Sequence, residues 1–234
     1  MKRFVVLSML SLLFSLTGLA QKNNLKINVL SLGATNISLQ DEYSISGNSS
    51  IALGVSYLPE RGLPSFAIKD DPSNNAKNLK LGGFSITPEY RYYFKGNGPK
   101  GLYLAGYFRY AKYTTKEYDF TYDKSSGSDG TVRIEGDFTS SVFGIMLGSQ
   151  WLLGEKWTLD WWIIGAGFGS QKGEYEGTGT FSNQDQTDIQ NEVNSIDLPV
   201  ADVAVTTSSS SVKVTIEPKY PAFRGFGLCL GYRF

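Results

Sequence analysis

Strict alternation of bulky apolar side chains with small or polar ones is the feature that most limits how this chain can fold. The stretch 226–234 reads FGLCLGYRF, in which Phe, Leu and Tyr alternate with Gly, Cys and Arg. Successive side chains of a β-strand point to opposite faces, so this run predicts a strand with one apolar face and one small or polar face. After residue 21 no segment keeps a helical spacing of apolar residues for long, which indicates an all-β chain.

The same period of two recurs along the chain and predicts eight strands, at residues 25–31, 37–45, 51–57, 82–94, 102–113, 139–151, 157–169 and 222–234. The second, fourth and sixth connections between them are tight, whereas long outer loops are expected at residues 58–81, 114–138 and 170–221. An up-and-down barrel places the three tight turns on one side. Outer-membrane barrels have short periplasmic turns and long outer loops, so the connection lengths match that class.

The alternation alone does not say which face points into the barrel, and a soluble lipocalin-like barrel with an apolar inside is the alternative. The small or polar face carries opposite charges, which a dry core tolerates only when they are paired. Aromatic residues gather where strands end, as a girdle at a bilayer interface requires: Phe94, Trp151, Trp157 and Phe234. We therefore predict an eight-stranded antiparallel up-and-down transmembrane β-barrel, with its apolar face on lipid and Phe234 beside the first strand.

Two residues fit this pattern badly. Asp41 falls on the lipid face of the second strand, so we expect it to lie near a rim or to be turned inward by a bulge. Pro88 lies inside the fourth strand and cannot donate a ladder hydrogen bond, which predicts a bulge there.

The first twenty residues have the pattern of a secretory signal peptide. Lys2 and Arg3 precede the apolar run 4–16, and the small residues Gly18 and Ala20 suit cleavage after Ala20. A retained anchor is the competing interpretation, but a membrane span needs about 20 apolar residues. We therefore predict a signal peptide at residues 1–20 and one barrel domain at residues 21–234, located in the cell outer membrane.

Composition argues against several functions. Cleavage after Ala20 would remove Lys2 and Arg3 and leave 20 basic residues against 22 acidic ones. Because the mature chain would then carry no excess of positive charge, no nucleic-acid partner is expected. Cys229 is the only cysteine and cannot form an internal disulfide. The chain has no His, which removes the usual general base of barrel enzymes that act on lipid or peptide, and no metal or other cofactor is expected.

The polar face of the predicted strands carries one group of candidate site residues. Seven ionisable side chains are expected to face the lumen: Lys26, Glu42, Glu89, Arg91, Arg109, Asp160 and Arg233. An eight-stranded barrel is only just wide enough for side chains to fill it. Paired charges would therefore form a polar plug, and the alternative is a narrow ion path through rearranging pairs.

The last long loop carries the second group of candidate residues. Residues 173–212 contain seven acidic residues and no basic one: Glu174, Glu176, Asp185, Asp188, Glu192, Asp197 and Asp202. Such a segment either binds a basic or calcium-rich partner or is solvated and disordered. A short helix is expected near residues 187–197.

Four stretches resemble one family. LKINVLSLGATNISLQDEYSI, ITPEYRYYF, FGIMLGSQWLLGEKWTLDWWIIGAGFG and PKYPAFRGFGLCLGYRF are together similar to small outer-membrane β-barrel proteins of Bacteroidota, largely of unknown function. The resemblance implies location and fold, and it carries no catalytic residues. Asp41 and the long last loop depart from the family pattern.

The function predicted from these observations is that of a monomeric, non-enzymatic barrel with a structural or partner-binding role at the cell surface, or an accessory role in a larger envelope complex. Its expected partners are outer-membrane lipid and an envelope or extracellular protein reached through the long loops. A narrow pore for ions or small solutes is the alternative, and a lipid-modifying enzyme is the third hypothesis.

Overall fold

The computed structural model describes residues 22–62, 80–95, 98–195 and 201–234. They form β1 (Asn23–Asn28), α2 (Val29–Gly33), β2 (Ile37–Ser44), β3 (Ser49–Gly62), β4 (Lys80–Tyr93), β5 (Gly101–Asp123), β6 (Asp129–Leu153), β7 (Trp157–Thr178), α3 (Asn183–Ser195), β8 (Ala201–Thr207), β9 (Ser211–Pro218) and β10 (Ala222–Arg233). The expected signal peptide, most of the loop expected at 58–81, and Asp197 lie outside the described residues. Neither helix in these ranges is long and apolar enough to cross a membrane.

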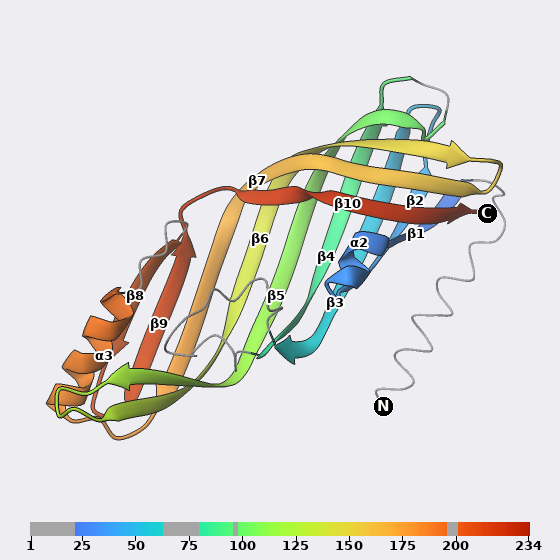
Figure 1. Cartoon of the computed structure of the whole chain (residues 1–234). Coiled ribbons are helices and arrows are strands. Elements are labelled where there is room, and N and C mark those ends of the chain that lie inside the picture. The colour runs from blue at the N-terminus through green and yellow to red at the C-terminus, as the bar shows by residue number, and fades with distance from the viewer. Residues whose placement is uncertain (1–21, 63–79, 96–97, 196–200) are drawn as a thin grey trace, which may run out of the picture.

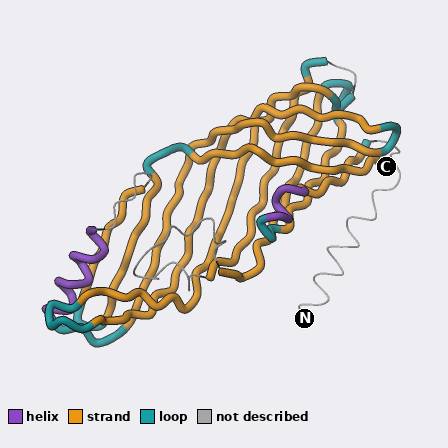
Figure 2. The backbone as a smooth tube through the Cα atoms, in the orientation of Figure 1, coloured by secondary structure: helices purple, strands orange, loops and turns teal. Residues whose placement is uncertain are grey.

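Eight of the strands close into an antiparallel barrel (Figures 1 and 2). The strands from β1 to β7 each pair with the next in the chain, and β10 pairs with both β1 and β7. At the closure the Phe234 amide donates to the Asn23 carbonyl oxygen at 3.1 Å, so the last residue lies beside the first strand as predicted. The predicted all-β, eight-stranded antiparallel barrel is confirmed.

The two faces of the barrel wall differ as the alternation predicts. Outward side chains are large and apolar, and many are strongly exposed, such as Leu53 (51%), Phe143 (69%) and Ile145 (63%). Inward side chains are small or polar, and they include the fully buried Lys26 and Arg91. The polar residues therefore fill the lumen, and the apolar residues cover the outside.

Three strands continue far beyond the rest of the barrel. β5 and β6 stay paired as far as Asp123 and Asp129, and β7 follows β6 to Gly177. β9 then pairs with β7 and β8 with β9, which gives a five-stranded extension at the lower left of Figure 1. We call these distal parts of β5, β6 and β7, together with β8 and β9, the outer sheet.

The outer sheet corrects two predicted loops. Most of residues 114–138 and 170–221, expected to be loop, are strand or helix instead. Apolar residues still alternate along these strands, as at Val132 and Ile134 on β6 and at Val212 and Val214 on β9. Charged and Ser-rich stretches interrupt the alternation, so it was not recognised as strand. These strands are stable because they pair with one another, and those pairings are long-range and invisible in any single window of sequence.

A second hydrophobic core holds α3 against the outer sheet. Ile189 and Val193, one helical turn apart, are buried against Phe120, Tyr122, Val132 and Ile134 of the β5–β6 hairpin and Val212 of β9. The helix starts with a reciprocal cap, in which the Asp185 amide donates to Ser182 Oγ at 3.1 Å and the Ser182 amide donates to Asp185 Oδ2 at 3.0 Å. The helix expected near 187–197 is therefore present but begins at Asn183.

The inward bulge expected as one explanation for Asp41 is absent, and so is the bulge expected at Pro88. Asp41 lies within β2, opposite Leu25 and Leu53, and no register shift turns it inward. It lines an outer hollow together with Pro88. β4 keeps its register through Pro88, which remains opposite Leu53 of β3 but has no partner on β5. The strand therefore accommodates proline by losing pairing on one side, and it needs no extra residue.

Candidate functional site in the barrel lumen

Five of the seven predicted lumen charges meet in one buried group, which we call the lumen cluster: Lys26, Glu42, Glu89, Arg91 and Asp160. Lys26 Nζ lies 2.6 Å from Glu42 Oε2 and 2.7 Å from Asp160 Oδ2. Arg91 Nη1 lies 2.8 Å from Asp160 Oδ2, and its Nη2 lies 2.8 Å from Glu89 Oε2. All five side chains are at most 1% exposed.

The strand register explains why these groups converge. Glu89 and Arg91 are two residues apart on β4, so both point inward. Lys26 of β1 lies opposite Gln40, the inward neighbour of Glu42 on β2, and Asp160 reaches the centre from β7. Four different strands thus supply one network, which makes it a product of barrel closure.

Neutral side chains complete the lumen cluster. The Tyr103 hydroxyl donates to Asp160 Oδ1 at 2.8 Å, and the Tyr93 hydroxyl donates to Glu42 Oε1 at 2.6 Å. Gly148 makes room for the Tyr103 ring, because a Cβ at this glycine would lie 2.3 Å from Tyr103 Cζ. Charges, amides and phenol groups therefore fill this level of the lumen as a paired polar plug.

The two remaining predicted charges lie outside the lumen cluster. Arg109 is on β5, nearer the outer sheet, and its hydrogen bonds to Thr87 Oγ1 and the Tyr113 hydroxyl are long, at 3.5 and 3.4 Å. Arg233 is half-buried near the end of β10, opposite Asn24 of β1. Neither forms a described ion pair with the five clustered residues.

Sequence reasoning missed Arg224, which joins the lumen cluster through an ion pair between its Nη2 and Glu89 Oε1. Counting back by twos from Leu228 would place Arg224 on the outer face. An irregularity changes the alternation: β7 carries one extra residue relative to β6 between Trp162 and Ile164, and Phe226 on β10 has a positive φ of 56°. Phe223 and Phe226 both point outward as a result, at 76% and 77% exposure, and Arg224 points inward.

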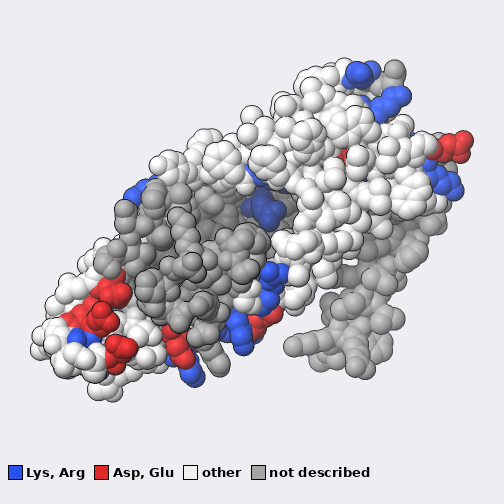
Figure 3. Space-filling view, viewed as in Figure 1, with Lys and Arg blue, Asp and Glu red and all other residues white. Residues whose placement is uncertain are grey.

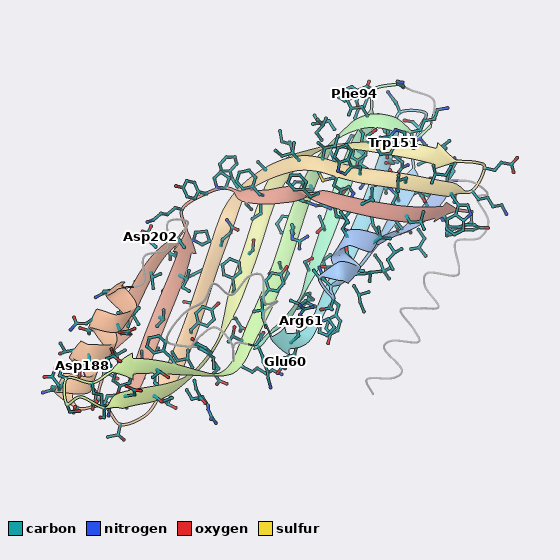
Figure 4. The ribbon with its side chains drawn as sticks, viewed as in Figure 1. Glu60, Arg61, Phe94, Trp151, Asp188 and Asp202 are labelled. Carbon is teal, nitrogen blue, oxygen red and sulfur yellow. The ribbon has the colours of Figure 1, made fainter. Side chains whose placement is uncertain are left out.

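The acidic residues predicted as one outer surface are dispersed and locally paired. Glu174 pairs with Lys172 at 2.9 Å, Asp185 with Lys124 at 3.2 Å, and Asp202 with Lys219 at 3.0 Å. Figure 4 shows Asp188 and Asp202 at different ends of the outer sheet. Glu176 pairs with Lys213, and Glu192 also has an interaction partner. Several carboxylates therefore bind lysines that lie outside residues 173–212, which the composition of that segment alone could not show.

Two of these carboxylates hold α3 to the β5–β6 hairpin. Asp188 accepts hydrogen bonds from the Ser125 amide at 2.9 Å and the Ser125 hydroxyl at 2.6 Å, and these bonds lower its pKa. The Ser182 hydroxyl and amide, followed by Lys124, hold the pKa of Asp185 at about 2. These contacts join α3 to the residue before it and to the turn between β5 and β6, so they hold the helix in place.

The described residues contain no group of three or more His, Cys, Asp or Glu side chains arranged to hold a metal ion. Cys229 is buried on the inner face of β10. The chemistry that the described lumen offers is therefore that of paired charges and hydrogen-bond donors.

Comparison with known proteins places the chain in a family without assigning an activity. No curated protein matches it. No solved structure matches it. A family described as "Protein of unknown function (DUF3575)" matches residues 5–198, which is most of the chain. The protein belongs to this family of unknown function.

Proposed function

We propose that this protein is a non-enzymatic outer-membrane barrel that anchors the outer sheet at the cell surface, where the sheet binds a protein partner. The observation that carries the proposal is the inverted distribution of side chains: a charged, buried lumen inside a wall of exposed apolar residues. A soluble protein rarely exposes a contiguous apolar area of this extent, whereas lipid tails would cover it favourably.

The exposed apolar band has an aromatic boundary at each end, which supports the membrane assignment. Phe94, Trp151 and Trp157 are 42–55% exposed beside the short turns; Figure 4 labels the first two. Phe168, Phe223 and Phe226 are 72–77% exposed at the other end. On the face shown in Figure 3 the barrel wall between these ends carries few charged side chains. Aromatic girdles on both sides of an apolar band are the pattern of membrane barrels.

The lumen cluster supports an anchoring role over conduction. Its ion pairs cross the barrel from β1 and β2 to β4 and β7, and the side chains are almost fully buried. A continuous water column through that level would need these pairs to separate, which removes the compensation for several buried charges. The barrel is therefore proposed to be a closed, rigid support.

The outer sheet supports a partner-binding role. Within the described residues β8 pairs with β9 alone, and the part of β5 beyond Tyr118 pairs with β6 alone. The outer sheet therefore has two edges without a strand partner, and α3 packs against both of these strands. Unpaired strand edges can accept a strand from another protein. An envelope or extracellular protein is the proposed partner, and the barrel itself is proposed to be a monomer delivered by a cleaved signal peptide.

Two adjacent tryptophans on β7 provide a test of the membrane assignment. Trp161 is 38% exposed on the wall, and Trp162 is 8% exposed in the lumen. We expect a variant that retains only Trp161 to be quenched strongly by brominated phospholipid in vesicles, and a variant that retains only Trp162 to be quenched weakly. Equal quenching, or a mature chain that is soluble without detergent, would contradict the proposal.

The partner-binding role has its own test. A photo-cross-linker at Ala204 on the exposed face of β8 is expected to capture a defined protein in intact cells, and a cross-linker at Glu155, in the tight β6–β7 turn, serves as the control. Capture at Glu155 but not at Ala204 would refute the assignment of the outer sheet as the binding surface.

A narrow pore is the second candidate, because the lumen above the cluster widens into a polar hollow. Planar bilayer recordings separate the two functions. A closed anchor gives no discrete openings. Openings whose conductance or ion selectivity changes in Arg109→Gln or Glu89→Gln would refute the plug and support the pore.

A further inference from the structure

The outer half of the lumen, between the lumen cluster and the outer sheet, contains a hollow of about 530 Å³. Asn36, just before β2, lines it together with residues from β2, β5, β7 and β10, among them Ser38, Tyr107, Arg109, Trp162 and Arg224. In Figure 3 basic side-chain atoms lie in a hollow near the centre of the face shown. Ligand pockets in proteins have volumes of about 300–1,000 Å³, so the hollow is large enough for a small organic molecule.

Arg224 forms part of the hollow and retains hydrogen-bonding capacity. Its side chain is 8% exposed, and Nη2 pairs with Glu89. Its Nε and Nη1 atoms are buried without a hydrogen-bond partner, as is Nε1 of the adjoining Trp162. The guanidinium carbon lies 4.5 Å from the centroid of the Trp162 ring and 5.0 Å from that of Tyr107, which fixes the orientation of the guanidinium group. Buried donors without partners are costly, and a ligand acceptor would relieve that cost.

Arg109 lines the same hollow, and its charge lacks a carboxylate partner within the described residues. Its contacts there, Thr87 and Tyr113, are neutral hydroxyl groups at 3.5 and 3.4 Å. By contrast, the basic residue three positions along β5, Lys112, forms an ion pair with Asp137 at 2.9 Å. Arg109 therefore has no ion pair within the described residues, and its two long hydrogen bonds to hydroxyl groups leave further guanidinium N–H donors for an oxyanion.

The charge balance of the lumen points the same way. Among the described lumen residues considered above, excluding the rim residue Arg233, four cations (Lys26, Arg91, Arg109 and Arg224) meet three carboxylates (Glu42, Glu89 and Asp160). One positive charge is left without a matching negative charge, and it lies at the level of the hollow. An anionic ligand would supply the missing charge.

We propose that this hollow binds a small organic anion, with a carboxylate or phosphate group held by Arg109 and Arg224 and an apolar part against Tyr107 and Trp162. The ligand enters from the outer-sheet end, because the lumen cluster closes the other side. This site is separate from the partner-binding edges of the outer sheet, so either proposal can fail without the other.

The test is calorimetric titration of the full mature chain in detergent with phenyl phosphate, benzoate and inorganic phosphate. Phenyl phosphate or benzoate is expected to bind more tightly than inorganic phosphate, because the aromatic walls add contact area. The tighter of the two organic probes identifies the anionic group. Arg109→Gln removes charged hydrogen bonds and is expected to weaken binding by about tenfold to a hundredfold. Arg109→Lys, which keeps the charge but not the fork, is expected to weaken it less.

Lys112→Gln is the matched control, because Lys112 lies on the same strand as Arg109 but outside the hollow. The affinity of this variant for the organic probes is expected to equal that of the wild type. Tryptophan emission gives a second readout that needs no arginine variant: binding should change the emission of the wild-type protein, and Trp162→Phe should abolish that change. The inference is overturned if neither organic probe binds, if inorganic phosphate binds as tightly as both, or if Arg109→Gln leaves the affinity unchanged.

Discussion

Arg91 provides the sharpest test of whether the lumen is a dry, paired plug. Its guanidinium is fully buried and donates hydrogen bonds to Glu89, Asp160 and Gln40 at 2.7–2.9 Å. The substitution Arg91→Met leaves Lys26 and Arg224 as the cluster cations for three carboxylates. One carboxylate then stays buried without compensation, and breaking a buried ion pair in this way typically costs about 3–5 kcal/mol.

The magnitude separates the two descriptions of the lumen. If water filled this level of the barrel, it would screen the charges, and the loss would fall to about 1 kcal/mol or less, as for exposed ion pairs. Urea unfolding of the protein in phospholipid vesicles, followed by tryptophan fluorescence, measures the change in unfolding free energy. The exposed pair of Arg133 with Asp119 is the control, and Arg133→Met is expected to leave the unfolding midpoint almost unchanged.

A double variant sharpens the same test. Asp160→Asn removes the negative charge that Arg91 and Lys26 share, so Arg91→Met combined with Asp160→Asn restores the balance of charge. The double variant is expected to lose less stability than the two single variants added together, because the two residues are in contact. Simple additivity, or an Arg91→Met effect no larger than that of Arg133→Met, would refute the paired plug.

Three further predictions concern other parts of the molecule. Asp185 has a folded pKa of about 2, so it stabilises the α3 contact above the ordinary pKa of an aspartate and loses this contribution as pH falls toward 2. Amide protection factors in α3, which compare each exchange rate with that of the unfolded chain at the same pH, should therefore fall between about pH 4 and pH 2. Protection factors that stay constant over that range contradict this role. Ile189→Ala should reduce the stability of the second hydrophobic core by about 2–5 kcal/mol. Amide exchange should then become faster in α3 and β8 and stay unchanged in the barrel. Unchanged exchange in α3 and β8 would mean that α3 does not depend on this contact. Gly148→Ala should impair folding, because the new Cβ would lie 2.3 Å from Tyr103 Cζ. In the control variant Gly106→Ala the new Cβ has no atom within 4 Å, so this variant should fold normally. Equal folding yields of the two variants would contradict the tight packing.

The regular part of the barrel was readable from sequence because alternation is a local property of an extended backbone. Leu53 faces outward and Arg91 inward for the same reason, namely that successive side chains of a strand point to opposite faces. Closure then follows from the number of strands and the tight connections. The inward direction of Lys26, Glu42, Glu89, Arg91 and Asp160 was predictable to the same extent, since each lies on a regular stretch of its strand; Asp160 precedes the irregularity in β7.

The parts that sequence reasoning missed depend on long-range geometry. The extra residue in β7 and the positive φ of Phe226 reverse the alternation and turn Arg224 inward. Residues 114–138 and 170–221 looked like loops because their strands gain partners, and α3 gains a core, only once distant segments pair. The acidic composition of residues 173–212 gave no sign of the neighbouring lysines that pair with several of these carboxylates.

The sequence by itself determined the strands of the barrel wall, the face that each residue occupies along a regular strand, and therefore the polar lumen and apolar wall. Only the tertiary structure decided which charges are paired, which donors are left without partners, and how far the sheet continues beyond the barrel. The physical reason is the range of the interactions: side-chain alternation is set by the backbone within a few residues, whereas ion pairs, bulges and strand pairing join residues that only the closed barrel brings together.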